Sequence, residues 1–420
     1  MAEAATDHPS LGREIVGRID ALGAISETPE NLTRIFLSPE HRVAAELLLS
    51  WMRQAGMRAD IDAIGNVCGR YEGDRPGLAC LMLGSHYDTV RDAGKWDGPL
   101  GVITAISCVA DLNRRGRRLP FAIEVVGFAD EEGVRFASTL LGSRAVAGTF
   151  VESVLGGKDS AGISMRQAMI DFGLDPDHIG AAARAPSELL AYVELHIEQG
   201  PVLESQHLPV GVVTAISGAT RLAASLVGVA GHAGTVPMAL RQDALTGAAE
   251  CIVAIEELCR TDPDGLVGTV GYIHAMPGAT NVIPGKVSFT MDIRAASDIH
   301  RRRAVTDIVR RIESIAKSRT LALQVDVTHE NRTVPCAPWL KAQVAEAVTA
   351  EGHRVFELPS GAGHDGMAMI DIADVAMVFV RCRGGVSHNP AEHVEEADAD
   401  AGARVLLRLI EHFRPRPKDA

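Results

Sequence analysis

LACLMLGSHYDTVRDAGKWDGPLG, residues 78–101, runs from a continuous apolar stretch through a glycine-rich loop into the start of a helical pattern. An uninterrupted apolar stretch of this length is typical of a strand buried on both faces of a parallel sheet. The loop holds His86, Asp88 and Asp97, and Pro99 suits the first turn of the following helix. The segment therefore predicts a strand, a loop with metal-binding residue types, and a helix.

The same pattern recurs along the chain. A helical stretch at 101–115 follows the first strand, and further apolar runs, FAIEVVGFA, AYVELHI and VAMVFVRC, occupy 121–129, 191–197 and 375–382. Apolar strands alternating with helices predict an α/β fold, with a mostly parallel sheet covered by helices on both faces.

The pattern changes between residues 213 and 329. There the order is an alternating strand, a long helix, alternating strands, a second helix (298–319) and a strand. This order predicts an inserted ferredoxin-like α+β domain at 213–329 within a discontinuous first domain at 1–212 and 330–420.

Charge and composition limit the function. The 420 residues carry 41 Lys and Arg against 54 Asp and Glu, a formal net charge of −13, which disfavours nucleic acid and anionic membranes as partners. The seven cysteines form no C-x-x-C pair, and neither an export signal at the N-terminus nor an 18-residue apolar run is seen. We expect a cytoplasmic protein that acts on a small molecule.

Metal-binding residue types follow four of the predicted strands: His86 after the first, Asp130 to Glu132 after the second, His196 to Gln199 at the end of the third, and His388 beyond the fourth. A single histidine beside an apolar run is usually a hydrogen-bonded core or surface residue. Four such groups at equivalent strand ends are harder to explain as core, because buried carboxylates are costly unless paired or metal-bound. Imidazoles and carboxylates without thiolates indicate Zn²⁺ or Mn²⁺ in a hydrolytic site.

Four carboxylates in these segments could have different roles. Adjacent residues of an extended backbone point to opposite sides, so one of Glu131 and Glu132 could bind a metal while the other moves a proton. A turn of acidic surface residues is the alternative. Asp97 could bridge two metals about 3.5 to 4 Å apart, and Asp88 could orient the His86 imidazole from behind.

Seven motifs, in order, resemble the amidase, hydantoinase/carbamoylase family of the M20 metallopeptidase superfamily. They are GSHYDTV, GKWDGPLGV, FADEEGVRF, ELHIEQGPVLE, GHAGTVPM, PSGAGHDGMAM and GGVSHNPAEH, and the match runs from about residue 15 to 412. The resemblance implies a catalytic di-metal domain with an inserted lid and dimerisation domain, and a homodimer.

The resemblance also implies residue roles. His86, Asp97 and His196 would hold one divalent ion and Asp97, Glu132 and His388 the other, with Glu131 as general base. The ions would be Zn²⁺ or Mn²⁺, with Co²⁺ or Ni²⁺ as further possibilities. The implied substrate contacts are Gln199, His232, Asn281, Arg294, Gly361 and His364.

Two of these contacts have a physical reason beside the resemblance. The Arg294 guanidinium could bind a carboxylate through two nitrogens, unless it pairs with Asp292 on the same strand face. His232 could stabilise a developing oxyanion, and in many relatives it reaches the site from a second subunit.

Among reactions, we expect hydrolysis of a ureido C–N bond with release of ammonia and carbon dioxide. Allantoate, an intermediate of purine catabolism, is the first candidate substrate, and an N-carbamoyl-L-amino acid or N-carbamoyl-β-alanine is the alternative. A peptidase is disfavoured, because the peptidase branch usually has a carboxylate at the position of His196. A binding protein without catalysis is disfavoured by the complete ligand set and Glu131.

Overall fold

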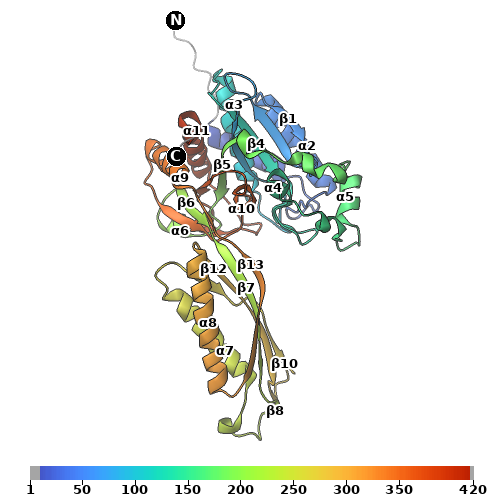
Figure 1. Ribbon diagram of the computed structural model, residues 1–420, viewed down its shortest axis with the longest axis vertical. Coiled ribbons are helices and arrows are strands. Elements are labelled where there is room, and N and C mark those ends of the chain that lie inside the picture. Colours follow the sequence, from blue (N-terminus) through green and yellow to red (C-terminus); the bar gives the residue numbers. More distant parts are fainter. Residues whose placement is uncertain (1–9, 417–420) are drawn as a thin grey trace. The chain divides into compact units, whose positions relative to one another are not determined.

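The computed structural model describes residues 10–416 and shows a mixed α/β fold (Figure 1). The chain divides into two compact units, the first comprising the segments up to Thr214, Cys336–Leu358 and from Ala362 onward, and the second Ala215–Pro335 and Pro359–Gly361. Residues 1–9 and 417–420 lie outside the described residues, and they include part of the N-terminal segment inspected for an export signal and both ends of the predicted first domain.

The first unit is built on a large sheet. Its strands are β1 (Arg58–Ile61), β2 (Val67–Tyr71), β3 (Cys80–His86), β4 (Ala122–Phe128), β5 (Leu189–Ile197), β6 (Val210–Ile216), β15 (Glu357–Ser360) and β16 (Val375–Val380). Its α-helices are α1 (Leu11–Gly23), α2 (Pro39–Gln54), α3 (Pro99–Arg114), α4 (Leu141–Val146), α5 (Met165–Asp171), α6 (Val202–Ser205), α9 (Pro338–Ala350), α10 (Gly366–Met369) and α11 (Glu396–His412). Short 3-10 turns are η1 (Glu152–Gly156), η2 (Pro176–Ala182), η3 (Pro186–Glu188) and η5 (Arg383–Gly385).

The sheet is parallel at its centre and antiparallel at its ends. The strand order is β1-β2-β4-β3-β5-β16-β6-β14, with β14 (Val334–Pro335) at one end and β15 also pairing with β6. Strands β4, β3, β5 and β16 run parallel to one another, whereas β2 and β6 flank them in antiparallel pairings. The expectation of a mostly parallel sheet therefore holds for the four strands predicted from apolar runs.

Alternation of side chains explains why these strands are buried on both faces. On β3, Leu81 and Leu83 belong to the core that packs under α1, α2, α3, α9 and α11, whereas Cys80 and Met82 belong to a smaller core with residues of α4 and α10. Because both faces of the central strands are covered, the sequences of these strands are largely apolar and do not alternate between polar and apolar residues.

The second unit has an antiparallel sheet with two helices. Its strands are β7 (Gly218–Val227), β8 (Gly231–His232), β9 (Val267–Thr269), β10 (Ile273–Met276), β11 (Val282–Ile283), β12 (Lys286–Ala295) and β13 (Ala322–Asn331). Its helices are α7 (Ala244–Arg260) and α8 (Asp298–Ser318), with the 3-10 turn η4 (Met238–Leu240). The order is β10-β12-β7-β13, β9 also pairs with β12, and β8 and β11 form a separate pair.

One face of this sheet carries the core of the second unit. Buried side chains alternate along β12, and they pack with those of α7 and α8, which lie side by side (Figure 1). The alternate residues of β12, including Asp292 and Arg294, point to the other face and are partly exposed. Polar groups placed there are available to a ligand.

None of the helices within residues 10–416 combines the length and the apolar character needed to cross a membrane.

Candidate metal centre

The predicted metal-binding residues of the first unit meet at one edge of its sheet. Since β4, β3, β5 and β16 are parallel neighbours, their carboxyl ends lie side by side. His86 is the last residue of β3 and His196 lies near the end of β5, while Glu131 and Glu132 follow β4 and His388 follows β16.

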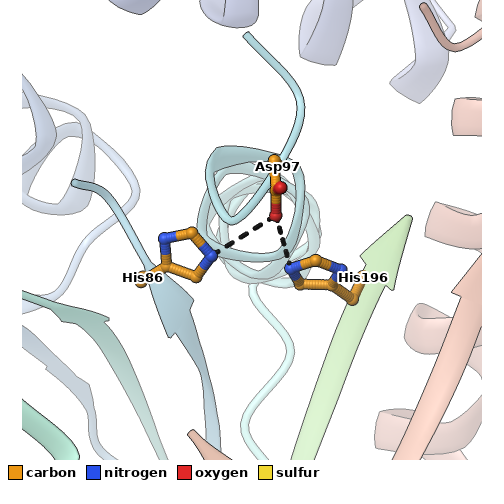
Figure 2. Close-up of side chains that lie close together, drawn as sticks. All are labelled: His86, Asp97 and His196. Carbon is orange, nitrogen blue, oxygen red and sulfur yellow. Dashed lines mark ion pairs between the residues drawn. The ribbon is translucent and has the colours of Figure 1, made fainter. Parts of the chain in front are cut away.

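Asp97 lies between two groups of ligand atoms. Its Oδ1 is 3.5 Å from His86 Nε2 and 3.1 Å from His196 Nε2, and Figure 2 shows both rings directed at it. Its Oδ2 is 3.1 Å from His388 Nε2, which lies 3.3 Å from Glu132 Oε1. Each oxygen of one buried carboxylate thus faces a different group, His86–Asp97–His196 or Asp97–Glu132–His388, and the atoms of each group lie within 4.8 Å of one another.

The imidazoles are oriented for metal binding by their other nitrogens. His86 Nδ1 lies 3.1 Å from the carbonyl oxygen of Asp88, and His196 Nδ1 lies 2.9 Å from that of Ile197. A carbonyl oxygen only accepts, so each Nδ1 donates; in the neutral imidazole that a metal requires, each Nε2 then has a lone pair on the side of Asp97. His196 Nε2 is buried, and among the described residues it has no hydrogen-bond partner. Lone pairs converging on a carboxylate oxygen fit a divalent cation, and nitrogen and oxygen ligands fit Zn²⁺ or Mn²⁺.

Glu131 and Glu132 do not point to opposite sides, and the extended-backbone argument for separating their roles is wrong. Strand β4 has ended before them and the chain bends here, so one ligand atom from each lies within 4.8 Å of the other and of His86. The Asp88 carboxylate holds this bend, because it accepts the N–H of Glu131 at 3.0 Å and that of Glu132 at 3.3 Å. Asp88 Oδ1 also lies 3.4 Å from His86 Nδ1, so Asp88 links the bend to His86.

Burial and neighbouring charges separate the carboxylates electrostatically. Burial, and then the charge of Glu132, raises the pKa of Glu131 well above its ordinary value. Burial also opposes the charge of Asp97, but the three facing histidines hold the pKa of Asp97 well below its usual range. Asp97 and Glu132 raise the pKa of His388 to about 10. A carboxylate surrounded by imidazoles has the donor set of a metal site, and a carboxyl group with a raised pKa is a stronger base than an ordinary one.

Backbone geometry in the loops is adapted to these contacts. Gly98 has φ +82°, and a Cβ at this position would meet the His86 ring at 2.5 Å. His388 and Gln199 also have positive φ, 54° and 57°, which costs a non-glycine residue roughly 1–2 kcal/mol. The site therefore contains backbone strain that the surrounding contacts must offset.

Two predicted substrate contacts lie beside the metal-binding residues. Gln199 Nε2 donates to Asp97 Oδ2 at 2.8 Å and to Ser387 Oγ at 3.1 Å. The buried His364 ring is edge-on to His196, with centroids 4.5 Å apart. Glu198, which the sequence placed in the same cluster, turns away and accepts the backbone N–H groups of Val202 and Leu203.

His232 and Asn281 are neighbours in the second unit. His232 pairs with Val282 across β8 and β11, and the N–H of Ala233 donates to the carbonyl oxygen of Asn281. His232 Nδ1 accepts the Gly234 N–H at 3.1 Å, which leaves the ring proton of the neutral form on Nε2. Both His232 and Asn281 are exposed, and His232 Nε2 can donate to a ligand.

Arg294 forms the ion pair with Asp292 that the sequence left open. Its Nε and Nη2 donate to the two oxygens of Asp292 at 2.9 and 3.0 Å, and its Nη1 donates to the Gly361 carbonyl oxygen at 2.7 Å. Arg221 Nε donates to the same Asp292 at 3.1 Å. Three of the five N–H groups of Arg294 are thus used, which leaves one on each terminal nitrogen for a second anion.

A pocket of about 590 Å³ lies beside this pair. Two arginines, one aspartate and three threonines are among its lining residues: Arg221, Arg294, Asp292, Thr269, Thr290 and Thr328. Two cations against one anion leave an excess positive charge, which suits a carboxylate ligand.

Sequence reasoning missed two residues of the first unit. Glu392 Oε1 accepts the N–H groups of Trp96 and Asp97 at 2.8 and 3.0 Å. Ser387 Oγ lies 2.8 Å from Asp97 Oδ2 and 3.0 Å from Glu392 Oε2. Burial, and then the charge of Asp97, raises the pKa of Glu392 to about 7. Both residues stand in the motif GGVSHNPAEH, from which only His388 was taken.

Comparisons with known proteins agree with this geometry. The peptidase family M20/M25/M40 matches residues 82–412. The chain is 42% identical to an allantoate deiminase of Arabidopsis thaliana, over 96% of this chain and 82% of that protein. It is also 42% identical to an N-carbamoyl-L-amino acid amidohydrolase of Geobacillus stearothermophilus, over 95% of this chain and 98% of that protein.

A solved structure supports the same assignment. An amidase of the hydantoinase/carbamoylase family from Burkholderia multivorans superposes with a TM-score of 0.90 at 31% identity, over 96% of this chain and 98% of that one. The resemblance drawn from the seven motifs is confirmed. The chain belongs to peptidase family M20/M25/M40, a family of hydrolases, and within it to the hydantoinase/carbamoylase amidases.

Proposed function

We propose that the protein is an amidohydrolase that cleaves the ureido C–N bond of a small carboxylate, with allantoate as the first candidate substrate. The observation that carries the proposal is the division of the Asp97 oxygens between two ligand groups, with Glu131 beside them. An N-carbamoyl-L-amino acid is the second candidate, because the identity to the relative with that substrate in its name is equally high.

The ligands of the two divalent ions would be His86, Asp97 and His196 for one and Asp97, Glu132 and His388 for the other. When bound, such ions supply Lewis-acid polarisation of the carbonyl and a more acidic water. Zn²⁺ and Mn²⁺ suit the donor set equally, and Co²⁺ or Ni²⁺ could replace them.

The protein's own residues would complete the reaction. Glu131 accepts a proton from the attacking water and returns it to the leaving nitrogen, because burial and the charge of Glu132 raise its pKa and so make it a stronger base. His232 Nε2–H donates to the oxyanion that develops on the ureido carbonyl. Water adds to the carbonyl carbon and ammonia leaves, and the remaining carbamate decomposes to carbon dioxide and an amine.

Other residues would hold the substrate. The two remaining N–H groups of Arg294 bind its carboxylate, while Gln199, Asn281, Gly361 and His364 contact its polar groups. We also propose that 213–329 is an inserted lid and dimerisation domain and that the working form is a homodimer, in which His232 acts either within its own subunit or on the site of the second subunit. Sedimentation of the purified protein tests the dimer.

The test of the reaction is ammonia release by the Mn²⁺- or Zn²⁺-loaded protein. The panel consists of allantoate, ureidoglycolate, N-carbamoyl-β-alanine, several N-carbamoyl-L-amino acids and dipeptides. We expect the highest kcat/KM with allantoate. Cleavage of dipeptides without cleavage of any ureido compound would overturn the proposal, and cleavage of an N-carbamoyl-L-amino acid alone would select the second candidate.

A further inference from the structure

Glu392 connects the two chain segments that bear Asp97 and His388. It lies in the segment after β16, and its side chain is buried with only 4% of the residue exposed. Its Oε1 accepts two backbone N–H groups, from Trp96 and Asp97, and its Oε2 contacts Ser387 Oγ. The Glu392 carboxyl group therefore contacts Trp96, which precedes Asp97, and Ser387, which precedes His388. It also contacts the backbone of Asp97 itself.

The Ser387 hydroxyl group links Glu392 to the oxygen of Asp97 that faces His388. Ser387 Oγ is 3.0 Å from Glu392 Oε2 and 2.8 Å from Asp97 Oδ2, the oxygen that faces His388. Gln199 Nε2 donates to the same Asp97 oxygen and to the same hydroxyl. Asp97 is thus held at its backbone nitrogen and at one carboxylate oxygen by a single network.

The glycine at position 94 makes space for the Glu392 carboxyl group. A Cβ on Gly94 would lie 2.3 to 2.5 Å from the Glu392 side chain, closer than real side chains approach. His388 is held at φ +54°, a conformation that a non-glycine residue keeps only when other contacts fix it. Both features tie the loop before α3 to the segment after β16 at Glu392.

We propose that Glu392 is a positioning residue that fixes the bridging orientation of Asp97, and that it acts on the Asp97–Glu132–His388 group through Ser387. The proposal rests on the metal-binding role assigned to Asp97 under the proposed function. Removing a residue that hydrogen-bonds to a metal ligand commonly lowers metal affinity by roughly 10- to 100-fold.

The test is metal affinity rather than turnover. The full-length protein is titrated with Mn²⁺, and the free ion is followed by its electron paramagnetic resonance signal. We expect Glu392→Ala to raise the Kd for Mn²⁺ at least about tenfold. We expect Glu392→Gln to stay within about threefold of the parent, because its amide oxygen still accepts two N–H groups and its NH₂ donates to Ser387 Oγ.

Glu198→Ala is the matched control. Glu198 is a buried carboxylate that also accepts two backbone N–H groups, but these come from Val202 and Leu203 and not from the segments of Asp97 and His388. It should lower the stability measured by urea unfolding without changing the Kd for Mn²⁺. An equal loss of Mn²⁺ affinity in the Glu198 and Glu392 variants would reduce Glu392 to a folding role and overturn the proposal.

Ser387→Ala covers the case in which Glu392→Ala does not fold. It removes the link to Asp97 Oδ2 and keeps the two backbone hydrogen bonds, so we expect a Kd raised about three- to tenfold. Unchanged Mn²⁺ affinity in Ser387→Ala, or in a folded Glu392→Ala, overturns the proposal. A parent protein that binds no Mn²⁺ or Zn²⁺ overturns the metal centre itself, and this result is distinguishable because it appears before any substitution.

Discussion

Exchanging Glu131 for glutamine should lower turnover by roughly 10²- to 10⁴-fold and leave both metal binding and folding intact. The backbone of Glu131 is held at both of its polar groups, because its N–H donates to Asp88 at 3.0 Å and its carbonyl oxygen accepts the N–H of Leu140 at 3.1 Å. The hydrogen bond that holds this residue, to Asp88, comes from its backbone N–H and survives the substitution. The amide matches the carboxyl in size but cannot accept a proton near neutral pH.

The size of the effect follows from the role of a general base. Burial and the charge of Glu132 raise the pKa of Glu131, which makes it a stronger base than an ordinary carboxylate. Such a base contributes roughly 10²- to 10⁴-fold, or about 3 to 5 kcal/mol of activation free energy. We expect kcat for ammonia release to fall by this factor, with the Kd for Mn²⁺ unchanged.

Glu132→Gln is the matched control, one residue away. Glu132 Oε1 lies 3.3 Å from His388 Nε2, so this variant removes a charged ligand and should weaken Mn²⁺ binding first. Both variants are assayed by steady-state ammonia release at saturating Mn²⁺ and by direct Mn²⁺ titration. A Glu131→Gln protein with kcat within threefold of the parent, or with the same metal loss as Glu132→Gln, would refute the assignment of base and ligand.

Three further predictions concern the surroundings. Asp88→Asn should lower the free energy of unfolding in urea by about 1–3 kcal/mol, since its amide NH₂ would face one of the two partly buried N–H groups of Glu131 and Glu132; an unchanged urea midpoint would contradict this. Arg294→Lys loses the paired contact with Asp292 and should raise KM for a carboxylate substrate about tenfold, with a smaller change in kcat; an unchanged KM would mean that the carboxylate binds elsewhere. Dialysis against a chelator should abolish ammonia release and lower Tm, because an ion that binds only the folded chain stabilises it. Adding Mn²⁺ or Zn²⁺ should restore both activity and Tm. Activity in protein shown to be metal-free by elemental analysis would contradict the proposed mechanism.

The parallel centre of the sheet was predictable because strands buried on both faces have largely apolar sequences. The apolar runs at 78–85, 121–129, 191–197 and 375–382 correspond to β3, β4, β5 and β16. The antiparallel flanks were not predicted. Strands such as β1 and β2 are short and partly exposed, and their pairing depends on contacts across the sheet that local sequence does not encode.

The site was predictable where position in the fold dictates it. Residues at the carboxyl ends of adjacent parallel strands must meet, and His86, His196 and the acidic pair after β4 do so. The directions of Glu131 and Glu132 were predicted incorrectly, because the bend after β4 is set by the Asp88 carboxylate from another strand end. Side-chain direction in loops depends on such contacts.

The two ligand groups differ in exposure, and this difference explains where the supporting contacts lie. In the first group the side chains of His86 and His196 are 3% and 1% exposed, and rigid strands deliver both. In the second, the His388 side chain is 49% exposed and follows a strained loop, so its position depends on neighbouring side chains. Glu392 and Ser387 lie on this second side and contact the Asp97 oxygen that faces His388. The fold itself supports the buried group, whereas the exposed group needs a dedicated network. For the same reason that network could not be recognised from strand patterns alone.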